Sequence, residues 1–236
     1  MLYVYTTGSM VKSSPPCGHV MEFIRDLTDH NERGWFLANK SRYEAAHASM
    51  LEVARVLIKG ISGFDSEVAH VQPKDCLYRI YRDIRFSPDK SPYKRHMGCY
   101  INPRGRQSDH VGYYLHLQPW GQSFVAGGTW QLPTPILKML RQKVVNQTEE
   151  FRAIVEAPAF KQLFPEITDD PLKVMPHDVP RDFPYPEYLK CRSYCVTHYL
   201  TDDFFSEPDW TDRVVEMFRE MKPFLDFLNE VIDDYI

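Results

Sequence analysis

The chain has little of what marks a secreted or membrane-spanning protein. Its 236 residues include only five cysteines, an odd number at irregular spacings, which argues against a disulfide scaffold and favours a reducing compartment. No run reaches the roughly 18 to 20 apolar residues that a membrane span needs, and the N-terminal residues contain no uninterrupted apolar stretch typical of a signal peptide. We therefore expect a soluble cytoplasmic protein with no membrane contact.

Net charge is also small, at −4, so the chain lacks the broad basic footprint that binding to a phosphate backbone requires. Nucleic acid is therefore not the expected partner. The distribution of charge is uneven, however. Residues 74–106 carry nine lysines and arginines against three aspartates, whereas the chain after residue 201 is mostly acidic.

The composition is that of a folded protein, with 43% hydrophobic and 25% charged residues. A chain of 236 residues fits one large domain. We expect a single α+β domain over residues 18–236. Residues 1–17 match no predicted element, and we interpret them as a loose N-terminal arm.

Apolar residues at three- and four-residue spacings predict helices in four regions. These regions are residues 20–27, 31–61, 133–155 and 208–235, with Asn31 as the expected N-cap of the second. Between the last two, residues 158–186 contain too many prolines for regular structure. Their large apolar side chains nevertheless predict an ordered segment that packs against the core.

Residues 71–131 change to alternation with a period of two, and turn sequences separate the alternating runs. Short loops favour antiparallel neighbours. The predicted strands are 76–87, 97–102, 110–118 and 122–131, and residues 194–200 alternate like one further strand. The expected fold is an antiparallel meander packed by N-terminal, middle and C-terminal helices.

A basic segment at residues 79–94 is the strongest candidate site. Arginines on one element, followed by lysines in a loop, can grip a phosphate or carboxylate through forked, charge-assisted hydrogen bonds. The candidate anion-binding residues are Arg79, Arg82, Arg85, Lys90, Tyr93 and Lys94. The alternative is that Asp83 and other carboxylates of the chain neutralise these cations in an ion network that binds nothing.

Other reactive residues give weaker signals. A metal site could be formed by Cys191, Cys195 and His198, whose side chains are common metal ligands. However, residues four positions apart on a strand are about 13 Å apart, which is too far to bind one tetrahedral ion. We therefore expect no metal and no cofactor. His110, His116 and His198 could each act as a general base, although no serine or cysteine beside them stands in a recognisable nucleophile motif. Whether the protein is an enzyme stays open at this level.

Two classes of function are consistent with these patterns. The first is binding of a small phosphorylated or carboxylated ligand through the basic segment. The alternative is a non-enzymatic interaction module whose basic face docks an acidic partner or a nucleic-acid backbone. A salt titration of binding to an oligonucleotide separates the two, because backbone binding weakens steeply with salt.

Several sequence blocks resemble those of a known family. Residues 79–94 (RIYRDIRFSPDKSPYK) are similar to the signature of the domain of unknown function 2461 family. Residues 31–40 with Tyr43, the run Gly112-Tyr-Tyr-Leu-His-Leu, and Gly127-Gly-Thr-Trp130 resemble its other recurring blocks in the same order. The resemblance covers about residues 20–205. It implies no particular activity, cofactor or catalytic residue.

Overall fold

The centre of the structure is a four-stranded antiparallel meander. The computed structural model describes residues 14–130 and 132–235. The strands follow one another in the order β1-β2-β3-β4. They are β1 (Met97–Ile101), β2 (Tyr113–Leu117), β3 (Ser123–Gly128) and β4 (Cys195–Leu200).

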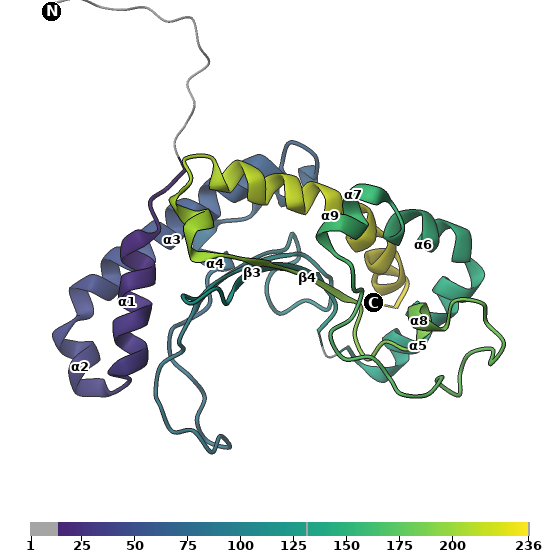
Figure 1. The fold of residues 1–236 in the computed structure, drawn as a ribbon, viewed down its shortest axis with the longest axis horizontal. Coiled ribbons are helices and arrows are strands. Elements are labelled where there is room, and N and C mark those ends of the chain that lie inside the picture. Colours follow the sequence, from purple (N-terminus) through teal and green to yellow (C-terminus); the bar gives the residue numbers. More distant parts are fainter. Residues whose placement is uncertain (1–13, 131, 236) are drawn as a thin grey trace, which may run out of the picture.

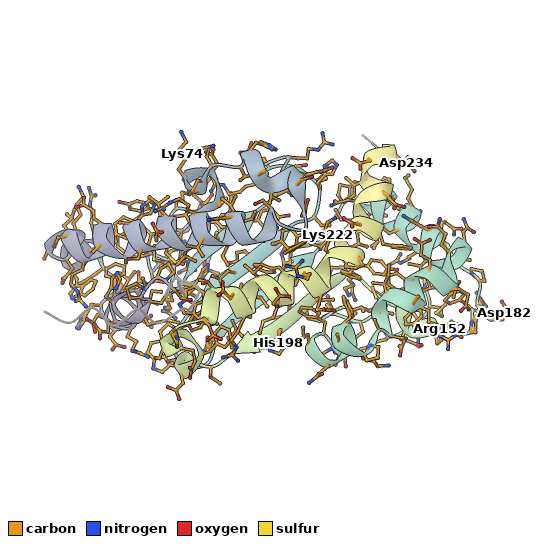
Figure 2. All side chains as sticks on the ribbon, turned by 90° about the horizontal axis from the view of Figure 1, so that it is seen from above. Lys74, Arg152, Asp182, His198, Lys222 and Asp234 are labelled. Atoms are coloured by element: carbon orange, nitrogen blue, oxygen red, sulfur yellow. The ribbon has the colours of Figure 1, made fainter. Side chains whose placement is uncertain are left out.

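Two long helices, α3 (Lys40–Ile61) and α9 (Trp210–Tyr235), cover one face of this sheet. They lie side by side over the strands, as the view from above shows (Figure 2). A Cβ atom at Gly60 would lie 2.5 Å from Cγ2 of Val215, so glycine at this position lets the two helices approach closely. The helices and the sheet face below them form the core.

The remaining helices stand at the two ends of the sheet (Figure 1). Beside the first half of α3 lie α1 (Gly18–Asp29) and α2 (Arg33–Ala38), and α4 (Pro73–Cys76) leads towards β1. The opposite end contains α5 (Thr134–Asn146), α6 (Thr148–Val155), α7 (Pro158–Leu163) and α8 (Pro186–Leu189). Short 3₁₀ turns are η1 (Ser66–His70) and η2 (Asp202–Ser206). None of the described helices is long and apolar enough to cross a membrane.

Alternation along the strands divides the side chains between two faces. Cys99, Leu115, Val125 and Val196 are fully or almost fully buried beneath the helices. Their sequence neighbours point to the other side, because successive side chains of a strand project to opposite faces. That second face is not covered by α3 or α9 (Figure 1), and we call it the open face.

The predicted fold class is confirmed, and so is the strand near residues 194–200. The helix predicted over 31–61 is instead two helices, α2 and α3, with a break at Asn39. Asn31 does not cap it: its side chain pairs with the backbone of Tyr93, with both N···O distances at 3.0 Å. The helix predicted over 133–155 is likewise divided, at Gln147.

The strand predicted at 76–87 is wrong. After α4 the chain makes single bridges, Leu77 with Cys99 and Tyr81 with Tyr93, and otherwise forms an irregular loop. This loop of residues 77–96 extends from the sheet on the open-face side (Figure 1). Arg82 and Arg85 bind residues of the loop itself, and these contacts hold the chain in a turn that a continuous ladder of strand hydrogen bonds would not allow.

The described parts of both predicted irregular regions pack against the rest of the fold. Residues 1–13 of the predicted arm lie outside the described part of the chain, but residues 14–17 pack against α9. There Trp210 Nε1 donates to the carbonyl of Pro15 at 3.1 Å, and Cys17 is buried. In the proline-rich passage, Phe160 and Phe164 are buried, so the passage is ordered against the core. The prediction that it has no regular structure is wrong for its first residues, which form α7 with Pro158 in the first turn, a position where proline costs no hydrogen bond.

Candidate functional site

A cavity of about 690 Å³ lies on the open face of the sheet. Strands β2, β3 and β4 form its floor, and segments on either side of the sheet, including residues from the 77–96 loop and from the β1–β2 connection, form its walls. A volume of this size suits a small organic ligand, since such sites typically measure about 300 to 1,000 Å³. We refer to it as the open-face cavity.

One row of aromatic side chains crosses the floor. In the register of the sheet, His116 of β2 lies opposite Phe124 of β3, and Phe124 lies opposite Tyr199 of β4. The His116 and Phe124 rings are stacked, with centroids 4.4 Å apart, and Tyr199 lies 5.6 Å from Phe124. His96 extends the row beyond β2, at 4.2 Å from His116. A row of this kind offers flat faces on which a planar ligand can stack.

Small side chains lie beside this row and give the cavity its depth. Ala126 pairs with Thr197, and Gly128 pairs with Cys195, all on the open face. Gly128 has φ of 118°, a conformation that glycine adopts without strain. Its missing side chain also leaves room for Tyr194, because a Cβ there would lie 2.1 Å from the Tyr194 carbonyl oxygen.

Two cations lie at one side of the cavity, around a single ring. Lys94 Nζ is 5.2 Å and Arg106 Cζ is 5.4 Å from the centroid of Tyr78. Burial, with the charges of Arg79 and Arg106, lowers the pKa of Lys94 below its usual 10.5. Asp109 and Asp169 also line the cavity, but among the described residues neither forms an ion pair with Lys94 or Arg106. The positive charge therefore lacks a direct carboxylate partner.

A directional chain of hydrogen bonds runs along the floor from Tyr114 to Gln122. The Tyr114 hydroxyl lies 3.0 Å from His116 Nδ1, and His116 Nε2 lies 3.0 Å from Gln118 Oε1. Gln118 donates its amide N–H to Gln122. Because an amide oxygen only accepts, Nε2 of His116 carries the proton and Nδ1 accepts from Tyr114. The Tyr114 oxygen thus has its lone pairs available as acceptors.

His96 and His116, the two histidines of the aromatic row, favour the uncharged form at neutral pH. Burial, with the charges of His116 and Lys94, lowers the pKa of His96 to about 3. Burial also lowers the pKa of His116, and the hydrogen bond that its Nε2 donates to Gln118 raises it in part. Burial raises the pKa of the Tyr114 hydroxyl above its usual 10. The imidazoles therefore contribute stacking surface and hydrogen bonds, and the cavity's positive charge comes from Lys94 and Arg106.

The candidate residues of the basic segment are divided by the structure. Lys94 lines the open-face cavity, and Arg79 lies close enough to influence the pKa of Lys94. Arg82 instead binds its own loop: Nη1 donates to Asp89 at 2.7 Å, and Nη2 donates to Ser87 at 3.2 Å. Arg85 pairs with Asp83 at 2.6 Å.

Lys90 and Tyr93 also make contacts within the fold. Lys90 Nζ donates to the carbonyl of Ile84 at 3.0 Å. Tyr93 is buried, and its ring stacks on Phe36 with centroids 4.1 Å apart. Within the loop, Arg82 and Arg85 therefore form internal ion pairs, while Lys94 lines the cavity. Sequence reasoning missed Arg106 and His96, which join the site only through the pairing of β1 with its neighbours.

The residues considered for a metal site do not converge. Cys195 and His198 lie on opposite faces of β4, since they are three positions apart along the strand. Cys195 lines the cavity, where burial raises the pKa of its thiol to about 12. All five cysteines are free thiols, and no group of three or more His, Cys, Asp or Glu residues in the described ranges could hold a metal ion.

Comparison with known proteins gives one match. The family model described as conserved hypothetical protein (DUF2461) matches residues 19–227. The match confirms the resemblance predicted from the sequence blocks. No curated protein and no solved structure matches the chain.

Proposed function

We propose that this protein, which belongs to the conserved hypothetical protein family DUF2461, binds a small phosphorylated or carboxylated ligand in the open-face cavity. The anionic group would lie against Lys94 and Arg106, and an attached planar ring would stack on the aromatic row of His116, Phe124 and Tyr199. Of the residues in the basic segment, Lys94 contacts the ligand directly in this proposal, and Arg79 adds positive potential nearby.

One observation carries the proposal. Lys94 and Arg106 flank the same ring inside a cavity, and no carboxylate among the described residues pairs with either. Bringing like charges together in a partly buried place is unfavourable, as the lowered pKa of Lys94 indicates. An anion placed between them removes this cost. Its charge-assisted hydrogen bonds are worth roughly 1.5 to 3 kcal/mol each.

The aromatic row argues for a ring on the ligand. Phe124 is half-buried and Tyr199 is largely exposed, so faces of the row are accessible from the cavity. Aromatic stacking contributes roughly 0.5 to 1.5 kcal/mol beyond buried area. Phenyl phosphate should therefore bind more tightly than inorganic phosphate.

Calorimetric titration of the purified protein with inorganic phosphate and with phenyl phosphate tests both parts. Lys94→Met and Arg106→Met should each weaken binding of both probes by about tenfold or more. Phe124→Leu should weaken phenyl phosphate alone.

Arg85→Met is the matched control, because Arg85 is 76% exposed in its ion pair and lies outside the cavity lining. The control should bind both probes like the parent protein. Equal weakening in Arg85→Met, or no binding of either probe to the parent protein, would refute the proposal.

A second candidate function rests on the 77–96 loop. Phe86 in this loop is 94% exposed, and the Arg85 guanidinium lies 5.8 Å from its ring centroid. An exposed ring beside cations fits docking of an acidic partner or a nucleic-acid backbone. A single-stranded oligonucleotide that binds with strong salt dependence, and loses affinity in a Phe86→Ala/Arg85→Met variant, would favour it.

A further inference from the structure

Residues from two segments that are far apart in the sequence meet at the edge of the open-face cavity. Ser108 and His110 lie in the connection between β1 and β2, and Asp233 lies in the last turn of α9. Ser108 Oγ is 2.8 Å from His110 Nδ1, and His110 Nε2 is 2.7 Å from Asp233 Oδ1. Serine, imidazole and carboxylate thus form a continuous hydrogen-bonded line.

Hydrogen-bond chemistry fixes the direction of the protons along this line. A carboxylate can only accept, so His110 donates the proton on Nε2 to Asp233. Nδ1 is then unprotonated and accepts from the hydroxyl of Ser108. This is the protonation pattern in which a histidine can remove a serine proton while a carboxylate stabilises the charge that the ring gains. Arg104 Nη2 lies 3.9 Å from the same Asp233 oxygen.

The backbone around His110 is held by several contacts. Its carbonyl accepts from Asn102 Nδ2 at 2.6 Å and from the Tyr100 hydroxyl at 3.1 Å. The next residue, Val111, donates its N–H to the side chain of Asn229 on α9 at 2.8 Å. The His110 side chain is only 10% exposed. The imidazole is therefore held in one orientation, which a general base requires.

Ser108 itself is accessible from the cavity. Its side chain is half-buried and lines the open-face cavity together with His110 and Arg106. The hydroxyl oxygen also accepts the backbone N–H of His110 at 3.1 Å. One lone pair on the oxygen stays available to attack a molecule bound in the cavity.

We propose that Ser108 is the nucleophile of an acyl-transfer site that hydrolyses small carboxylic esters carrying a negative charge. Ser108 Oγ forms a bond to the ester carbonyl carbon while its proton passes to His110 Nδ1. The bond from that carbon to the alkoxy oxygen then breaks, and the proton moves from His110 to the leaving alcohol. Water next attacks the carbonyl carbon of the acyl-serine and gives one proton to His110. The bond from that carbon to Ser108 Oγ then breaks, His110 returns the proton to Oγ, and the carboxylic acid and free Ser108 result.

The inference that the substrate is negatively charged rests on the proposed function, in which Lys94 and Arg106 bind an anion. Both residues line the same cavity as Ser108. The same cations also favour the oxyanion that develops on the carbonyl oxygen during attack. The nucleophile, in contrast, rests on the Ser108, His110 and Asp233 geometry alone. The two inferences can therefore be tested separately.

Labelling with an uncharged alkyl fluorophosphonate tests the nucleophile, because an activated serine forms an O–P bond as fluoride leaves. Peptide mass spectrometry of the full-length protein should place the adduct on Ser108, and Ser108→Ala should abolish it. His110→Asn should slow labelling by at least about 100-fold, the contribution of a general base. Asp233→Asn, at a residue whose side chain is 56% exposed, should keep the fold and also slow labelling.

The chain offers a matched control in a second serine–histidine pair. Ser49 Oγ lies 2.8 Å from His19 Nε2 between α3 and α1, and neither residue lines the described cavities. Ser49 should stay unlabelled, and Ser49→Ala should react like the parent protein.

Three results would overturn the nucleophile: no adduct on Ser108, equal adducts on Ser49 and Ser108, or unchanged labelling in both His110→Asn and Asp233→Asn. Protection of Ser108 by phenyl phosphate is a separate readout. If Ser108 is labelled equally fast with and without phenyl phosphate, the inferred substrate need not carry a negative charge, but the assignment of Ser108 as nucleophile is unaffected.

Discussion

A Cβ atom at Gly98 would lie 2.6 Å from the hydroxyl oxygen of Tyr114 on the neighbouring strand. Glycine on β1 therefore leaves the space into which the Tyr114 ring extends. From that position the hydroxyl reaches His116 Nδ1 and begins the chain of hydrogen bonds along the cavity floor. Because Gly98 has no side chain, the hydroxyl oxygen of Tyr114 can take its position in the cavity, where it can accept a hydrogen bond.

Replacing Gly98 with alanine should displace the Tyr114 ring and break its bond to His116. Overpacking of this kind costs roughly 1 to 3 kcal/mol of unfolding free energy. Urea denaturation measures the loss. Gly18→Ala is the control, because nothing lies within 4 Å of its added methyl group and alanine favours the helix that begins there. Equal stability of the two variants would contradict the steric account.

Anion binding should weaken at alkaline pH because of Lys94. Burial and two neighbouring arginines lower the pKa of Lys94 below 10.5, so the ammonium loses its proton sooner than an ordinary lysine. Affinity for sulfate, whose own charge stays constant, should be level near neutral pH and fall as pH rises through the lowered pKa. Calorimetry between about pH 7 and 10 measures this decline.

Two variants identify the source of that decline. Lys94→Met should abolish it, and Arg79→Met should move it to higher pH by removing one of the charges that lower the pKa. A decline that persists unchanged in Lys94→Met would assign the titration to another group.

Stability should fall in mild acid because His96 is buried without charge. Its pKa is about 3 in the folded protein and near 6.5 in the unfolded chain. Between these values the unfolded state binds more protons, so stability decreases as pH falls, by up to about 1.4 kcal/mol per pH unit. His96→Gln should show a shallower loss between about pH 6 and 4 in urea denaturation. The exposed His19→Gln serves as control, and an identical slope in both variants would count against His96.

Arg141 supports the far end of the domain from inside. Its side chain is buried, and Nη2 donates to the carbonyl of Cys191 at 2.7 Å, while Nη1 lies 3.6 Å from Asp178. Arg141→Met should lower stability by about 1.5 to 3 kcal/mol, because it leaves a buried carbonyl and a largely buried carboxylate without a partner. Adding Asp178→Asn should restore part of the loss in thermal or urea denaturation. A double variant less stable than the single one would refute this coupling.

The strands and long helices were predictable because their patterns are local. Val125 and Ala126, for example, alternate between core and open face as the period of two requires. The 77–96 loop was not predictable in this way. Its residues alternate like a strand, but Arg82 binds Asp89 and Ser91 further along the chain, and these contacts favour a turn.

The site was predictable only in part, for a similar reason. Lys94 belongs to a cluster that the sequence displays, whereas Arg106 joins it across Tyr78 through folding of the β1–β2 connection. His110 and Asp233 are 123 positions apart and meet only because α9 crosses the end of the sheet. A sequence pattern that spans a few neighbouring residues cannot reveal a contact between residues so far apart in the chain.

The helix α9 packs on β3, α3, α5, α6 and α7, and it follows all of them in the chain. A ribosome therefore completes every strand before it makes the helix that covers them. Until then Gly127, which meets Met221 and Leu225 of α9 in the finished protein, lacks this cover, and so does the part of the sheet around it. The nascent domain thus has an exposed apolar sheet for the time needed to synthesise its last helix. Exposed apolar surface of this kind makes an incomplete domain prone to aggregation.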